Sequence, residues 1–145
     1  MNDAIQKHFE DLEAKDRDVQ YNAFLALLEA MNEEVEWSYE VWDDLVEGLT
    51  SSNNHTRSRY AQFISRLAIS DPEKRILTDF PALWEVTKDP KFVTARHSLQ
   101  SIWRVGLAGT AQKEMVIVHL VDRFHACSDE KNYTLIRSDI LQSMR

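Results

Sequence analysis

The stretch DPKFVTARHSLQSIWRVG, residues 89–106, has the pattern of a polar turn followed by an amphipathic helix. Asp89 and Pro90 lie in the turn, and proline suits the first turn of a helix because its missing N–H costs nothing there. Leu99, Ile102 and Trp103 then follow at spacings of three and four residues, which puts them largely on one helical face. The stretch therefore predicts a turn and a helix with one buried side.

The same pattern recurs along the chain. It is present in NNHTRSRYAQFISRLA (53–68), more weakly in KDRDVQYNAFLALLEA (15–30), and most weakly in EKNYTLIRSDILQSM (130–144). The equivalent anchor positions are about 40 residues apart and are occupied by Gln20, Arg57, Arg96 and Arg137. A second amphipathic segment precedes each copy. The sequence thus predicts one domain, 1–145, of four helix–turn–helix units with approximate bounds 1–33, 34–69, 70–108 and 109–145.

Composition favours an all-α fold. The 145 residues fit one domain, and three glycines and three prolines leave few of the residues that hairpin turns require. Cys127 is the only cysteine and no signal-peptide pattern is present, so we expect a cytoplasmic protein without disulfides. The longest apolar run is far shorter than a membrane span, and we expect no membrane association.

Two signals predict helix boundaries in the third unit. Ser70 with Glu73 has the spacing of a capping box. Pro81 predicts that the segment 72–87 is broken into two short helices, because proline inside a helix removes a hydrogen bond.

Charge is unevenly distributed over a chain whose net charge is −7. Residues 1–50 hold three Lys or Arg and fourteen Asp or Glu, whereas residues 51–145 hold fourteen and ten. This balance disfavours a uniformly basic nucleic-acid binder but leaves a local cationic face in the second part open. We interpret the acidic part as a solvated surface, although it could also be functional.

Two-helix units with a period near 40 residues resemble the HEAT family of repeats over nearly the whole chain. The resemblance implies a right-handed αα superhelix (an α-solenoid, or armadillo-like fold) of about four helix pairs, whose second helices line the concave side. It also implies an Asp–Arg ladder between repeats, with Asp89 and Arg96 as one pair and Arg57 and Arg137 on neighbouring rungs. Gln20 departs from that pattern. The family is defined by its architecture, so it implies binding rather than a reaction.

Helix phase selects the residues that would line such a concave groove, since residues advance by about 100° along a helix. The positions opposite the inward-facing set run from apolar in the first repeat, through polar, to cationic: Tyr21, Leu25, Leu28, Ser58, Gln62, Ser65, His97, Ser101, Arg104, Ser138, Gln142 and Arg145. The three apolar residues would anchor a partner, or else be buried under the N-terminal helix or in a dimer. On the flank toward neighbouring repeats, Ser98 suits a packing seam and Arg66 faces Glu29.

Catalytic and metal-binding patterns have little support. Arg96, His97 and Ser98 are adjacent, so their side chains diverge on a helix and cannot form a triad. A weak zinc pattern fans around more than half of one helix, where a solvated outer face is the favoured interpretation: His119, Asp122, His125 and Cys127. Three tryptophans at helical spacing, namely Trp42, Trp84 and Trp103, are expected in the core. We expect no catalytic residue, no cofactor and no metal.

Two classes of function remain. The first is a protein-binding module or adaptor that holds a partner in its concave groove. A toxin-neutralising immunity protein or other inhibitor is a concrete form of it, since a small acidic protein suits a basic target. The second is nucleic-acid binding or base excision, as in the HEAT-like alkylpurine DNA glycosylases, with His97, Arg104 and Arg145 near phosphates. The catalytic carboxylate of those glycosylases cannot be mapped onto this chain, and the net charge of −7 disfavours binding to nucleic acid.

Overall fold

Helices form wherever the sequence has the amphipathic pattern, and the polar turns between them supply the caps. The computed structural model describes residues 1–145 and contains no strand. Its α-helices are α1 (Asp3–Asp11), α2 (Arg17–Met31), α3 (Ser38–Gly48), α4 (Asn54–Leu67), α5 (Ile76–Val86), α6 (Phe92–Ser101), α7 (Thr110–Ala126) and α8 (Tyr133–Ser143). Short 3-10 helices follow α4, α6 and α7, namely η1 (Ala68–Ser70), η2 (Ile102–Ala108) and η3 (Cys127–Asp129). The all-α expectation is confirmed.

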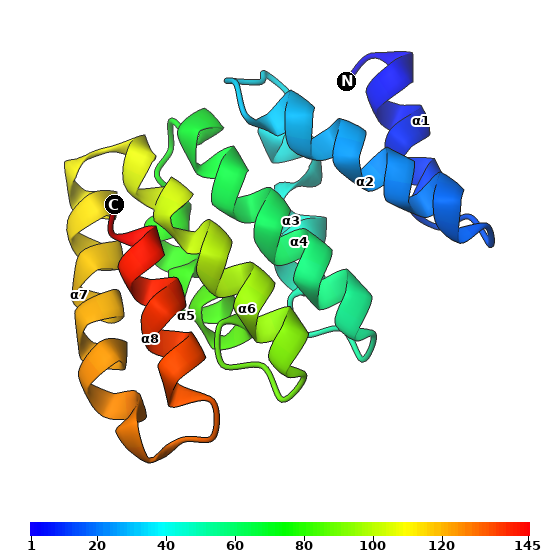
Figure 1. Ribbon diagram of the computed structural model, residues 1–145. Coiled ribbons are helices and arrows are strands. Elements are labelled where there is room, and N and C mark those ends of the chain that lie inside the picture. Colours follow the sequence, from blue (N-terminus) through cyan, green and yellow to red (C-terminus); the bar gives the residue numbers. More distant parts are fainter.

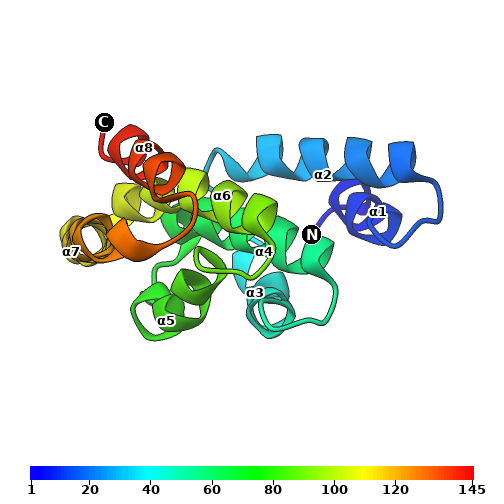
Figure 2. The same ribbon diagram turned by 60° about the horizontal axis from the view of Figure 1, so that its bottom comes forward.

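The helices lie in two layers (Figures 1 and 2). The second helix of each predicted unit belongs to one layer, in which α2, α4, α6 and α8 are neighbours in chain order. The first helices, α1, α3, α5 and α7, lie on the other side (Figure 2). In that view α2 and α8, at the two ends of the row, lie higher than α4 and α6, so the row of second helices is curved.

A continuous hydrophobic core fills the space between the layers and extends from Leu12 to Ile140. Most inward positions expected for the second helices are buried, with Phe63 and Ile140 fully covered and Leu99 only 2% exposed, whereas Met144 is 46% exposed. Burying each such side chain stabilises the fold by about 1.5–3 kcal/mol. The predicted helix phase of α4, α6 and α8 therefore agrees with the structure.

Two boundary predictions in the third unit are wrong. Pro81 does not split the segment, because α5 continues through it. The proline is exposed, while Phe80 and Leu83 on either side of it are anchored in the core. Asp71, not Ser70, satisfies the N–H groups at the start of α5. Its carboxylate accepts hydrogen bonds from the N–H groups of Arg75 and Ile76 at 2.9 and 2.8 Å.

The Ser70 hydroxyl instead joins the second and third units. Its Oγ accepts the N–H of Val35 at 2.8 Å, and its carbonyl oxygen accepts the Ser38 hydroxyl at 2.6 Å. The Tyr39 hydroxyl donates to Asp71 across the same seam. Burial and this hydrogen bond raise the pKa of Tyr39 to about 12. These contacts fix α3 against the start of α5.

Candidate functional site: the face of the second helices

Arg57 and Arg96, at equivalent positions in the repeat, each form a bidentate ion pair with the following unit. Arg57 Nε and Nη2 lie 2.6 and 3.1 Å from the Asp89 carboxylate. Arg96 Nε and Nη2 lie 2.9 and 3.0 Å from the carboxylate of Asp139 on α8. The expected Asp89–Arg96 pair is therefore wrong, because Asp89 lies in the turn beside α4 and is already bound by Arg57. Both arginines nevertheless link successive units.

Arg137, at the fourth anchor position, makes no ion pair. Its Nε donates to the carbonyl oxygen of Phe124 at 3.0 Å, and its guanidinium lies 4.8 Å from the Phe124 ring centroid. It ties α8 to α7 within one unit. In the first unit, the Gln20 side chain bonds to the Ala14 carbonyl oxygen and accepts a hydrogen bond from Arg59 at 3.3 Å.

We call the outward side of α2, α4, α6, η2 and α8 the second-helix face. Its apolar end is accessible, because Tyr21 is 55% and Leu25 is 43% exposed. Leu28 is half-buried against the core. The alternative that all three are covered within the monomer does not hold for Tyr21 and Leu25. Two neighbouring large apolar groups are thus open to solvent on α2.

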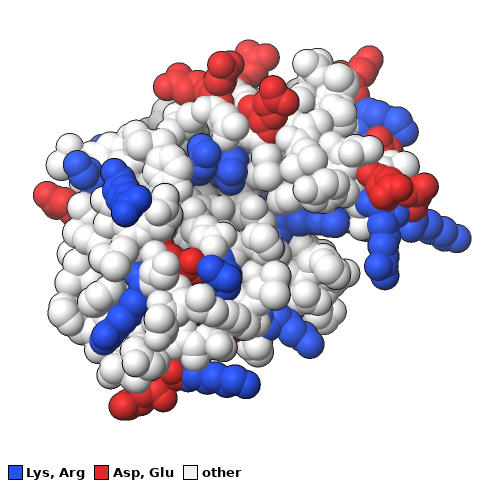
Figure 3. Space-filling model, in the orientation of Figure 1, with Lys and Arg blue, Asp and Glu red and all other residues white.

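The middle of the second-helix face carries two half-buried arginines without a carboxylate partner, Arg66 on α4 and Arg104 on η2. Arg66 Nε donates to Asn32 Oδ1 at 3.1 Å, not to the expected Glu29. The Arg104 guanidinium lies over the Trp103 ring, 4.7 Å from its centroid. Figure 3 shows Lys and Arg near the middle and along one side of this face, with Asp and Glu mostly around its rim.

The electrostatic state of this arginine pair favours an added anion. Burial, and then the positive charge of Arg104, lower the pKa of Arg66 to about 10. Burial also lowers the pKa of Arg104. Like charges that are partly removed from water and have no counter-ion are strained electrostatically, and a bound carboxylate or phosphate relieves that strain.

The remaining predicted groove residues divide by exposure. Ser65 and Ser101 are buried, at 0% and 7%, so neither can contact a partner as expected. Small side chains at these positions allow close helix packing, and Ser65 Oγ donates to its own helix at Ala61 O. Ser58 and Gln62 are half-buried on this face. The exposed positions are His97, Ser138, Gln142 and Arg145.

Trp103 is half-buried rather than in the core, in contrast to the buried Trp42 and Trp84. The physical reason is local. The chain tightens from α-helix to 3-10 helix after Ser101, and a 3-10 helix has 3.0 residues per turn, so the phase extrapolated from α6 fails there.

The weak zinc pattern is not assembled. His119 is half-buried with its ring centroid 4.8 Å from that of Phe80 and 5.1 Å from that of Trp84, so it does not lie on a solvated outer face. Val116 is buried whereas Ile117 is 39% exposed, so the side of α7 that carries His119 is turned toward the core rather than toward solvent. Cys127 is buried with its Sγ 3.6 Å from the Phe124 carbonyl oxygen. No three His, Cys, Asp or Glu side chains are placed to hold a metal ion.

Sequence reasoning missed a cleft where two turns meet beside the second-helix face. It has a volume of about 530 Å³ and lies between the α1–α2 turn and the α3–α4 turn. Its lining includes Lys15 from the first turn, Arg17 from the start of α2 and Arg59 from α4. The sequence does contain a sign of this cleft. Lys15 and Arg17 lie close together and are two of the three cations in the acidic segment 1–50.

In comparisons with known proteins, neither a family model nor a curated protein matches this chain. None of its helices has the length and apolar character needed to cross a bilayer.

Proposed function

We propose that this chain is a HEAT-like helical-repeat module of four helix pairs that binds a protein partner along its second-helix face. In this proposal the two-layer arrangement is a short α-solenoid and the second-helix face is its concave side. The role is binding, as an adaptor or inhibitor, and involves no catalysis. Repeat proteins of this kind use extended concave surfaces to hold partners.

The observation that carries the proposal is the joint presence of Tyr21 and Leu25, exposed at one end of the face, and the unpaired Arg66 and Arg104 at its middle. Tyrosine and arginine are the side chains most often found at the energetic centre of protein interfaces. An ordinary solvated helix face would carry polar side chains in place of Tyr21 and Leu25. It would also have carboxylates beside Arg66 and Arg104. A partner that supplies apolar groups to Tyr21 and Leu25 and acidic groups to Arg66 and Arg104 would bind favourably at both places.

Binding to a partner segment with acidic and apolar side chains fits this surface. An inhibitor or immunity-type protein is one form of the proposal, in which the face covers part of a target. The acidic residues 1–50 would then steer the module toward targets that also carry positive charge.

Affinity capture from the source cells tests the proposal. Tyr21→Ala with Leu25→Ser should leave the melting temperature and helical circular dichroism unchanged, because both side chains are exposed, while reducing capture of the principal partner by at least about tenfold. Leu77→Ser with Val118→Ala is the matched control, since these residues are 38% and 56% exposed on α5 and α7. Equal capture by wild type and the face variant would contradict the proposal.

The unpaired arginines also favour a second candidate, contact with nucleic-acid phosphates. A salt titration with duplex DNA separates the two classes, because binding to phosphates releases counter-ions from the DNA and this release contributes less free energy as the salt concentration rises. Tight, steeply salt-dependent and sequence-independent binding to DNA would favour this candidate. The net charge of −7 favours the protein partner.

A further inference from the structure

The cleft between the α1–α2 and α3–α4 turns is polar and cationic within the most acidic part of the chain. Its lining residues come from both turns and from the N-terminal halves of α2 and α4. Lys15, Arg17 and Arg59 line it against a single carboxylate, that of Glu13. None of the three cations forms an ion pair within the molecule.

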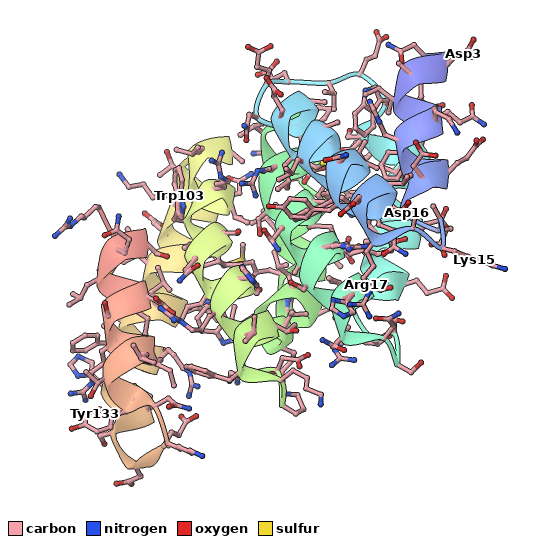
Figure 4. All side chains as sticks on the ribbon, turned by 45° about the vertical axis from the view of Figure 1, so that its right-hand side comes forward. Asp3, Lys15, Asp16, Arg17, Trp103 and Tyr133 are labelled. Carbon is pink, nitrogen blue, oxygen red and sulfur yellow. The ribbon has the colours of Figure 1, made fainter.

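The three cations differ in how firmly they are held. Arg59 is half-buried and fixed, with Nη1 3.3 Å from Gln20 Oε1 and its guanidinium 5.7 Å from the Phe24 ring centroid. Arg17 and Lys15 are exposed. Figure 4 shows Arg17 on the side of α2 toward the start of α4, while Lys15 extends toward solvent at the mouth. The cleft therefore has one preorganised guanidinium and two solvent-exposed cations around it.

Tyr21 joins this cleft to the second-helix face, because it lines the cleft and is also the exposed aromatic group next to Leu25. A chain segment with an apolar side chain on Tyr21 and Leu25 would place its adjacent residues at Arg17 and Arg59. The cleft is thus continuous with the proposed apolar anchor, and both can hold one extended segment.

We infer that the cleft formed by Arg17, Arg59 and Lys15 binds the carboxylates of an acidic segment of the protein partner, whose neighbouring apolar side chain packs on Tyr21 and Leu25. This inference rests on the proposed function and names the chemistry of the partner. Spread single charges on a peptide match cations that come from separate segments, Lys15 and Arg17 around the start of α2 and Arg59 within α4. The Glu13 carboxylate and the surrounding acidic residues repel a dense polyanion more strongly than a short peptide.

The experiment uses a synthetic peptide and the whole chain. The probe is an end-blocked hexapeptide of four glutamates followed by leucine and phenylalanine, and the control peptide has glutamines in place of the glutamates. Binding is followed by the ¹H–¹⁵N signals of backbone amides and arginine Nε–H groups. We expect shifts at residues 13–21 and 53–59, a Kd of about 1 mM or tighter that weakens with added NaCl, and at least about tenfold weaker binding of the glutamine peptide.

Arg17→Glu should weaken binding of the acidic peptide at least about tenfold without loss of fold, because Arg17 is exposed and has no internal ion pair. Lys113→Glu is the matched control, an exposed cation on α7 that forms no ion pair and lies outside the second-helix face, and should leave the Kd unchanged within about twofold. Equal affinity of the two peptides, or wild-type affinity of Arg17→Glu, overturns the inference. Inorganic phosphate shifting the same signals at lower concentration than the acidic peptide also overturns it.

The peptide titration and the capture experiment fail independently. The comparison of the glutamate and glutamine peptides, together with Arg17→Glu, reads the cations of the cleft, whereas capture by the Tyr21 and Leu25 variant reads the apolar anchor. If the acidic peptide does not bind in the cleft but the Tyr21 and Leu25 variant still loses its partner, the second-helix face remains the binding surface. Only its preference for an acidic segment is then removed.

Discussion

At the scale of single residues, the bidentate pair of Arg57 and Asp89 is the contact on which the second and third units depend. The Asp89 side chain is only 4% exposed and that of Arg57 17%. The carboxylate also accepts the N–H of Lys91 at 2.9 Å. Arg57 Nη1 bonds to the Ser51 carbonyl oxygen at 2.8 Å, so the same guanidinium holds the α3–α4 turn.

Asp89→Asn should lower the free energy of unfolding by about 1–3 kcal/mol at neutral pH, because it leaves Arg57 without its charged acceptor in a partly buried site. Although burial acts to raise it, the hydrogen bonds from Arg57 and Lys91 hold the pKa of Asp89 below its usual range. A lowered pKa stabilises the fold above the unfolded value, near 3.9, and this contribution is lost as pH falls through the folded pKa. The difference between wild type and Asp89→Asn should therefore shrink below about pH 4 in urea unfolding curves. A constant difference down to pH 2 would refute this assignment.

At the scale of helices, the close approach of α3 and α4 depends on Gly48. A Cβ built there would lie 2.2 Å from Cδ2 of the Tyr60 ring, closer than any real contact. Gly48 is the last residue of α3, and Tyr60 is half-buried in the middle of α4. The absence of a side chain at Gly48 thus lets the Tyr60 ring pack directly on the helix end.

Gly48→Ala should destabilise the fold by about 1–3 kcal/mol, since forcing the Tyr60 ring aside costs more than the roughly 1 kcal/mol that alanine gains in helix propensity. Gly106→Ala is the matched control, because the nearest atom to its Cβ would be Lys113 Cα at an ordinary 3.5 Å. That variant should be neutral or more stable by up to about 1 kcal/mol. Thermal unfolding of both variants checks the pair, and a stabilised Gly48→Ala protein would disprove the packing argument.

Helix phase could be predicted from the sequence where the helix stays regular. The spacing of Phe63, Leu99 and Ile140 placed three second helices correctly because a single buried stripe determines their rotation. The same reasoning failed after Ser101, where 3-10 geometry begins, and in α7, where exposed Ile117 and Val118 blur the stripe. The choice of Asp139 as the partner of Arg96, and the meeting of Arg17 with Arg59, depend on tertiary placement that local periodicity does not contain.

At the scale of the whole molecule, the charge asymmetry along the chain becomes an arrangement in space. On the side of the molecule seen in Figure 3, Asp and Glu lie mostly around the rim, while Lys and Arg are also present near the middle. The first helices bury aromatic side chains such as Trp42 and Trp84 in the core, whereas the second helix α2 leaves Tyr21 and Leu25 exposed. A partner that supplies acidic and apolar groups would fit that surface.

Hydrogen–deuterium exchange of the chain, free and with its captured partner, is the sharpest test of this surface. If the partner lies on the second-helix face, protection should increase in peptides from α2, α4 and η2, with the largest change at Tyr21 to Leu28. Peptides from α3, α5 and α7 should exchange at the same rate in both states. Protection centred on those first helices, with α2 unchanged, would contradict the binding role of the second-helix face.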